Sequence, residues 1–297
     1  MERMRHADRV VTQLGTPLTV HLGPSAASKA LARIATHDKS IRELSGDAAA
    51  ALRSRLHVVP SQRGSAQDAD ALERLWARAY CPEHELRCAQ QTVEHAQLFE
   101  RHGSKLSWQE LRADLVAKVL SALSLRRDDH FVDLGCSAGR LAVVAAMCTS
   151  VSSVEGVDLN PSRLELAREA ALRLGIGARV AFHEADLRDH PLHRATVAWC
   201  APHASTAARL ATQVVGRLQS ERPRGHTTRL LLAGALLPEA VAPLSRAYLF
   251  EAAKGAKDEF AVLYGGSTPQ LGPRLVAEYR IEGLVDGAEP EGEARTP

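Results

Sequence analysis

The chain has 297 residues, of which 45% are hydrophobic and 24% are charged, as in an ordinary soluble globular protein and unlike a disordered or collagen-like chain. Its 37 Lys and Arg residues nearly balance its 35 Asp and Glu residues, and the net charge of +2 excludes a strong overall attraction to nucleic acid. Nucleic-acid contact is therefore expected only through a local basic patch. Apolar runs such as Leu141 to Cys148 are much shorter than the roughly 18 residues of a membrane span, so no membrane partner is expected.

The cysteines do not form the pattern of a disulfide framework, because their number is odd and they are scattered along the chain. A reducing intracellular compartment, the nucleus or the cytoplasm, is therefore expected. The first ten residues contain no apolar segment of the kind that a secretory signal needs, which favours the same location. The five cysteines are Cys81, Cys88, Cys136, Cys148 and Cys200.

Residues 1–68 are predicted to form an N-terminal extension that is partly helical and loosely packed, and whose function the sequence does not indicate. Helical patterns occur at Ser25 to Thr36 and at Asp47 to Leu56. The segment Pro60 to Asp68 combines Pro, Gly, Ser and Gln without apolar periodicity, which is typical of a linker. A domain boundary is placed there.

Residues 69–123 are predicted to form a helical lead-in that ends in an amphipathic helix. Ser107 and Glu110 have the spacing of a capping box, in which the first side chain caps the helix and the second bonds back to its start. The helical run that follows begins at Leu111.

Apolar strands alternate with helical segments across residues 124–281, and this order predicts a parallel sheet with helices on both faces. The fold class is therefore α/β. Two later runs are expected to pair as an antiparallel edge, and residues 282–297 are expected to be an acidic disordered tail. The five predicted parallel strands are His130–Leu134, Val151–Asp158, Val180–His183, Ala195–Cys200 and Arg229–Gly234, and the two edge runs are Glu259–Tyr264 and Pro273–Ile281.

The turn after the first of these strands has the composition of a nucleotide-binding loop. Every second residue of this segment is acidic or small, at Asp133, Gly135, Ser137 and Gly139. The small side chains stand where the backbone must turn sharply beside a ligand at a helix N-terminus. The dinucleotide fingerprint G-x-G-x-x-G does not match, because Ser137 replaces the second Gly and Arg140 the third. Hydride transfer to NAD is therefore disfavoured.

The same letters, GCSAG, also match G-x-S-x-G, the nucleophile elbow of α/β-hydrolases. In that interpretation Ser137 is the nucleophile and needs an acid and then a His further along the chain. Asp158 or Asp186 with His203 or His226 have the required order. A serine hydrolase is therefore an alternative.

Acidic residues at two further strand ends favour a nucleoside ligand instead. Asp158 follows Gly135 by 23 positions, close to the roughly 20 that separate a glycine turn from an acid that binds ribose hydroxyls. Asp186 ends the third strand and is placed to accept from an adenine amino group. Three consecutive strands thus deliver an acid to the edge of the sheet where open α/β folds bind ligands.

This pattern resembles the class I methyltransferases, which use S-adenosylmethionine and have an acid-x-Gly-x-Gly-x-Gly turn. The resemblance covers residues 108–234 and implies a Rossmann-like methyltransferase sheet with an N-terminal helical extension. It also implies that Asp133, Gly135 and Gly139 contact the methionine part of the cofactor, Asp158 the ribose and Asp186 the adenine. The full set of cofactor-binding residues that it implies is Glu110, Asp133, Gly135, Cys136, Ser137, Gly139, Asp158, Asp186 and Cys200.

Within that superfamily the local sequence is similar to the disruptor of telomeric silencing family, the non-SET histone lysine methyltransferases. The likeness runs from Trp108 to Ala117, and it implies a cofactor role for Glu110 and a protein lysine, such as a histone lysine, as the methyl acceptor. The sequence departs from that family at Cys200-Ala201-Pro202, where the family has Asn-Asn-Phe. A small-molecule methyltransferase and a catalytically inactive cofactor-binding protein are the alternatives.

Two sets of side chains before the methyltransferase-like segment each have a structural and a functional interpretation. One contains Cys and His at a spacing that matches no standard zinc finger, so a packed helix face is preferred to a metal site. The other is basic, and a solvated helix surface is preferred to a polyanion-binding patch. The sets are Cys81, His84, Cys88 and His95, and Arg74, Arg78, Arg87, Arg101, Lys105 and Arg112.

Overall fold

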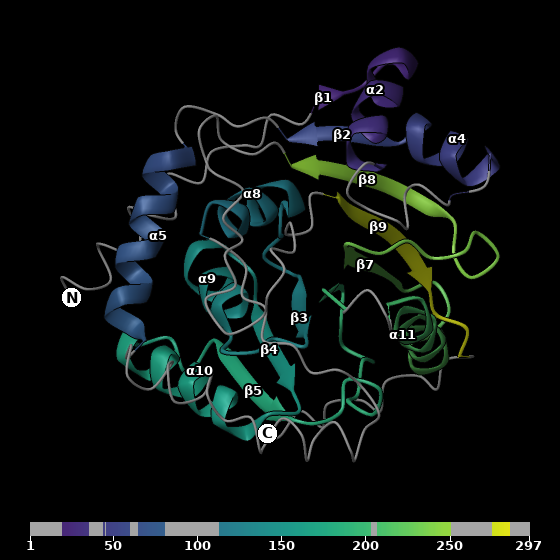
Figure 1. Cartoon of the computed structure of the whole chain (residues 1–297). Helices are drawn as coiled ribbons and strands as arrows, with labels where there is room; N and C mark the ends of the chain where they lie inside the picture. Colours follow the sequence, from purple (N-terminus) through teal and green to yellow (C-terminus); the bar gives the residue numbers. More distant parts are fainter. Residues whose placement is uncertain are drawn as a thin grey trace.

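The computed structural model describes residues 20–35, 44, 46–59, 65–80, 113–202, 207–250 and 275–285. The strands in these residues form one nine-stranded mixed sheet with the order β1-β2-β8-β9-β7-β6-β3-β4-β5 (Figure 1). The strands are β1 Val20–His21, β2 Leu56–Val59, β3 His130–Leu134, β4 Ser153–Asp158, β5 Val180–Glu184, β6 Val197–Cys200, β7 Thr227–Ala233, β8 Leu244–Phe250 and β9 Leu275–Glu282. The helices are α2 Pro24–Ala35, α4 Gly46–Ser54, α5 Ser65–Ala79, α8 Ala113–Leu123, α9 Arg140–Cys148, α10 Pro161–Leu174 and α11 Ala207–Glu221.

Strands β3 to β7 form a parallel sheet, as the alternating pattern predicts. From β3 the chain runs through α9 to β4 and through α10 to β5, and then crosses to β6 on the other side of β3. The strand order therefore reverses between β3 and β6. In open α/β sheets, ligands bind beyond the carboxyl ends of the strands at such a reversal.

Helix α10 illustrates how local sequence sets the element boundaries in this half. The side chain of Asn160 accepts a hydrogen bond from the N–H of Arg163, and Pro161 occupies the first turn, where its missing N–H costs nothing. Gly175 ends the helix in the left-handed conformation, with φ 71°. Asn160, Pro161 and Gly175 thus set both ends of the helix from local sequence alone.

Helices cover both faces of the sheet and bury two apolar cores. The first core lies between the sheet and helices α5, α8, α9 and α10, and the second lies beneath α11 (Figure 1). Alternation along β3 distributes the side chains, with Phe131 in the first core and Val132 and Leu134 in the second. No helix in the described part of the chain is long and apolar enough to cross a membrane.

The antiparallel part of the sheet differs from the prediction. The expected strand Pro273–Ile281 is β9, but it lies between β7 and β8 and pairs antiparallel with both of them. Strand β8 was not predicted, because Ser245 and Arg246 interrupt its apolar pattern. The other expected partner, Glu259–Tyr264, lies outside the described residues.

The start of the acidic tail is also ordered, against the prediction of disorder from residue 282. Glu282 still belongs to β9, and main-chain bridges join Gly283 to Arg224 and Val285 to Pro223. The N–H of Val285 donates to the carbonyl of Arg222 at 3.1 Å. Main-chain hydrogen bonds therefore fix this segment even though it contains few apolar residues. Residues 286–297 lie outside the described part.

The described part of the N-terminal extension, within residues 20–59, belongs to the sheet and is not loosely packed. Strand β2 pairs parallel with β8, β1 pairs antiparallel with β2, and helices α2 and α4 form a third small core with β2 and β8 (Figure 1). The predicted linker Pro60–Asp68 is wrong in its last four residues, because α5 begins at Ser65. The boundary between residues 68 and 69 stays a prediction.

Candidate cofactor-binding site

The loop that follows β3 is fastened to the neighbouring strand β4 by main-chain hydrogen bonds. The N–H groups of Gly135 and Cys136 both donate to the carbonyl of Val157, at 2.8 and 2.9 Å. The N–H of Gly139 donates to the carbonyl of Cys136 at 2.8 Å and closes the turn immediately before α9. The loop is therefore held rigidly at the carboxyl edge of the sheet.

Positive φ angles occur at alternate positions of this loop: 83° at Gly135, 54° at Ser137 and 74° at Gly139. At Gly139 a Cβ would lie 2.6 Å from the Phe182 ring and 2.8 Å from Ala167 Cβ, so glycine is required there for α9 to pack closely. At Gly135 a Cβ would meet no described atom within 4 Å. The space beside Gly135 is open, as it must be if a ligand approaches the loop there.

Asp158, at the end of β4, joins the loop to the start of α10. Its Oδ2 accepts from the N–H of Ser137 at 2.9 Å, and its Oδ1 accepts from the N–H of Asn160 at 2.9 Å. A carboxylate has about four lone-pair positions, so one on each oxygen is left for a further donor. Asp158 is half-buried. This geometry suits a carboxylate that receives two ribose hydroxyls.

Asp133 and Cys200 lie on the two strands that flank the reversal of strand order. Asp133 is 3% exposed and is in register with Trp199, while Leu134 is in register with Cys200. Burial, and to a smaller extent the charge of Asp133, raises the pKa of the Cys200 thiol to about 12. The thiol is therefore protonated and belongs to the core beneath α11, so a cofactor contact at this residue must use its main chain.

Asp186 lies after β5 at the same edge of the sheet, but its carboxylate faces its own turn. The Nε of Arg188 donates to both oxygens, at 2.8 and 2.9 Å, and its Nη2 contacts Oδ2. The Asp186 side chain is 8% exposed. An adenine contact from Asp186 stays a prediction, and it requires a lone pair that Arg188 leaves unused.

The described residues do not assemble a hydrolase triad around Ser137. Its Oγ is buried and has no hydrogen-bond partner among them, and Asp158 binds main-chain N–H groups instead of a His. His226 lies just before β7 and therefore at the amino end of a parallel strand, across the sheet from Ser137. His203, the other nominated His, is outside the described residues.

The remaining predicted side chains lie on the surface of α5 or outside the described residues. Of the basic set, Arg74 and Arg78 lie exposed on α5, as a solvated surface requires. The predictions outside the described residues are Glu110 with its partner Ser107, the Cys81, His84, Cys88 and His95 set, and Arg87, Arg101, Lys105 and Arg112.

Helix α5 and the residue after it contact the loop from outside, and no sequence pattern predicted this contact. The hydroxyl of Tyr80 donates to the carbonyl of Ala138 at 3.0 Å in a buried hydrogen bond. The guanidinium of Arg140 lies over the rings of Trp76 and Tyr80, at 4.8 and 5.3 Å from their centroids. The partners are about 60 residues apart, and no local pattern relates them.

Comparison with known proteins finds similarity in the parallel half. A family model described as a methyltransferase domain matches residues 131–216, from β3 into α11. Over 76 residues the chain is 33% identical to a probable cobalt-precorrin-6B C(15)-methyltransferase (decarboxylating) of Pyrobaculum aerophilum, a match that covers 25% of this chain and 39% of that protein. Over 95 residues it is 31% identical to a 23S rRNA (uracil(1939)-C(5))-methyltransferase of Salmonella choleraesuis, which covers 29% of this chain and 22% of that protein.

Among solved structures, an RNA methyltransferase of Salinibacter ruber, in complex with S-adenosyl-L-homocysteine, is similar with 17% identity and a TM-score of 0.43, over 62% of this chain and 98% of that one. The chain thus spans less than half the length of the two curated relatives. Neither of those relatives is named as a histone lysine methyltransferase, so the finer resemblance gains no support from them. The segment that is similar to a methyltransferase domain, residues 131–216, contains the loop, Asp158 and the reversal of strand order.

Proposed function

We propose that this chain is an S-adenosylmethionine-dependent methyltransferase. The observation that carries the proposal is the loop after β3, where no described residue fills the space at Gly135 and no described donor uses the remaining lone pairs of Asp158. The loop follows β3, one of the two strands at the reversal of strand order, and Asp158 ends the neighbouring strand β4. A loop built only to connect β3 to α9 needs neither that space nor those lone pairs.

The residues present fit this cofactor. Asp158 would accept from the ribose hydroxyls, and the loop from Gly135 to Gly139 would lie along the methionine part at the N-terminus of α9. When bound, S-adenosylmethionine supplies a methyl group already activated by its sulfonium charge. The protein therefore has to hold donor and acceptor in line, and needs little acid–base machinery of its own.

For the acceptor we propose a protein lysine, supported by the similarity of residues 108–117 to the disruptor of telomeric silencing family. The relatives are named for methylation of ribosomal RNA and of a cobalt-precorrin, which makes RNA and small molecules the competing acceptors. Incubation with methyl-labelled cofactor and cell extract separates the three. Label in protein that hydrolyses to methyl-lysine supports the proposal, whereas label only in RNA or small molecules overturns the acceptor and retains the methyltransferase.

A pair of variants tests the cofactor site itself. Gly135→Val places a branched side chain at φ 83° in the open space, and we expect it to abolish binding of S-adenosylhomocysteine in a thermal-shift assay. Ser137→Ala removes a hydroxyl without a described partner and should leave most binding and methyl transfer intact. Circular dichroism checks that both variants fold.

The same pair distinguishes the hydrolase alternative. A nucleophilic Ser137 predicts that Ser137→Ala removes almost all activity, whatever happens to binding. If Ser137→Ala is inactive while Gly135→Val binds S-adenosylhomocysteine normally, the proposed function is wrong.

A further inference from the structure

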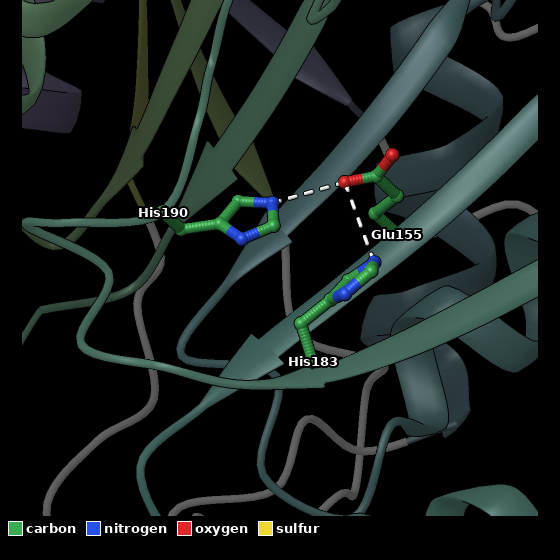
Figure 2. Close-up of side chains that lie close together, drawn as sticks. All are labelled: Glu155, His183 and His190. Atoms are coloured by element: carbon green, nitrogen blue, oxygen red, sulfur yellow. Dashed lines mark hydrogen bonds and ion pairs between the residues drawn. The ribbon is translucent and has the colours of Figure 1, made fainter.

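Three side chains away from the cofactor loop point toward one another: Glu155 of β4, His183 of β5 and His190 of the β5–β6 connection (Figure 2). Glu155 Oε2 lies 2.9 Å from His190 Nε2 and 3.6 Å from His183 Nε2. The three potential ligand atoms all lie within 4.8 Å of one another. Two imidazoles thus share one carboxylate oxygen.

The sheet geometry brings these residues together. Glu155 is in register with Ala181 and Val157 with His183, so Glu155 and His183 are diagonal neighbours on adjacent parallel strands. Both alternate with residues of the first core, Val154 and Phe182, and therefore lie on the opposite face of the sheet from α9 and α10. His190 reaches them from the turn after Asp186, whose carbonyl accepts its N–H at 3.0 Å.

Two features of the cluster indicate that it can bind a ligand. His183 Nε2 is buried from solvent and makes no hydrogen bond within the described residues, although it is aimed at Glu155. The other oxygen of that carboxylate, Oε1, is held by His130 Nε2 at 2.9 Å, and His130 Nδ1 contacts Ser153 Oγ. Such an outer partner fixes the orientation of a ligating carboxylate.

We propose that Glu155, His183 and His190 form a binding site for a divalent transition-metal ion of the zinc type. Two imidazole nitrogens and one carboxylate oxygen are ligands that suit Zn²⁺ and its neighbours, whereas Mg²⁺ and Ca²⁺ prefer oxygen ligands alone. Metal–ligand distances of about 2.0–2.2 Å in tetrahedral geometry place the ligand atoms about 3.3–3.6 Å apart. Glu155 Oε2 and His190 Nε2, which lie 2.9 Å apart, would therefore separate slightly on binding, by small side-chain rotations. The fourth position is left for water.

The position of the site indicates a structural role. It lies mid-strand, three residues before Asp158, and joins two strands to the connection that carries Asp186 and Arg188. Bound metal would tie this connection to β4 and β5. We therefore expect metal to stabilise the fold against unfolding, by a free energy that grows with the logarithm of the ratio of free metal to Kd.

The test uses the full chain, freed of metal with a chelator, and titrates it with Zn²⁺ alone by calorimetry and thermal unfolding. We expect one equivalent to bind at this site and to raise the melting temperature. His190→Ala and His183→Gln should each weaken binding at least 100-fold, and the exposed His226→Ala is the matched control that should leave it unchanged. His183 is partly exposed, so its variant keeps the test valid if His190→Ala fails to fold.

Co²⁺ separates this site from binding at Cys81, His84, Cys88 and His95. A site of nitrogen and oxygen ligands gives visible bands without the near-ultraviolet thiolate band that cysteine ligands add. No metal binding, binding that survives both His variants, or binding that only Cys81→Ser and Cys88→Ser remove would overturn the proposal. None of these results depends on methyltransferase activity.

Discussion

Two carboxylates, in the parallel and antiparallel halves of the same sheet, are held in different ways. Asp158 ends β4, is half-buried, and binds two main-chain N–H groups. Glu278 lies in the middle of β9, is 2% exposed, and accepts from Arg229 Nε at 3.0 Å and from the Tyr248 hydroxyl at 2.6 Å. One lies at an open edge, and the other lies inside the core.

The difference shows which carboxylate is available to a ligand. The main-chain donors to Asp158 are fixed by the fold and carry no net charge. They use about half of its lone pairs, so the others can accept from a ligand. Burial alone would raise the pKa of Glu278, but the hydrogen bond and charge of Arg229, the hydrogen bond of Tyr248 and the charge of Arg246 together lower it below its ordinary value. Glu278 is therefore an ionised structural group with its charge already compensated.

Replacing each carboxylate should give the largest difference between the two halves, in cofactor affinity for one and in stability for the other. Asp158→Ala removes the acceptor for ribose hydroxyls and should weaken S-adenosylhomocysteine binding by about 1.5–3 kcal/mol, or roughly 10- to 150-fold. Isothermal titration calorimetry measures this change in affinity. Glu278→Gln should instead lower the free energy of unfolding by about 1–3 kcal/mol and leave the affinity unchanged. Unchanged affinity in Asp158→Ala would place the ribose elsewhere.

Replacing one buried tyrosine in each half tests the same comparison, with a smaller expected effect. Tyr80 donates to the carbonyl of Ala138 in the cofactor loop, while the Tyr279 hydroxyl accepts from the N–H of Leu237 at 2.9 Å in the antiparallel half. Each Tyr→Phe change should cost about 1 kcal/mol of stability, measured by urea unfolding. Only Tyr80→Phe should also weaken cofactor binding, by several-fold. Equal affinities in the two variants would show that α5 does not position the loop.

The parallel half was predictable because its signals are local. The turn from Gly135 to Gly139, the cap at Asn160 and the acid at Asp158 each follow from residues within one βα unit. The parts that were missed depend on contacts between distant segments. Tyr80 and Ala138 are far apart in sequence, and β2 pairs with β8, whose partner β9 follows much later in the chain.

The cluster of Glu155, His183 and His190 was missed for the same reason. Glu155 stands alone between Val154 and Gly156 in the middle of β4, where one acid has no pattern of its own. Its partners become visible only when the register of β4 against β5 and the path of the β5–β6 connection are known. A His-rich segment after a strand, from His183 to His193, was the signal present in the sequence.

A further expected effect concerns acid stability in the antiparallel half. The folded state lowers the pKa of Glu278 from its ordinary value of 4.5, so ionised Glu278 stabilises the fold at pH values above 4.5. This stabilisation is lost as the pH falls through the lower folded-state value, because the unfolded chain then binds the proton more readily. Glu278→Gln has no such group, and its deficit in the free energy of unfolding should be full at pH 7 and shrink below pH 4.5. Urea unfolding of both proteins across this range measures the difference, and a deficit that stays constant with pH would show that Glu278 is not held ionised by Arg229.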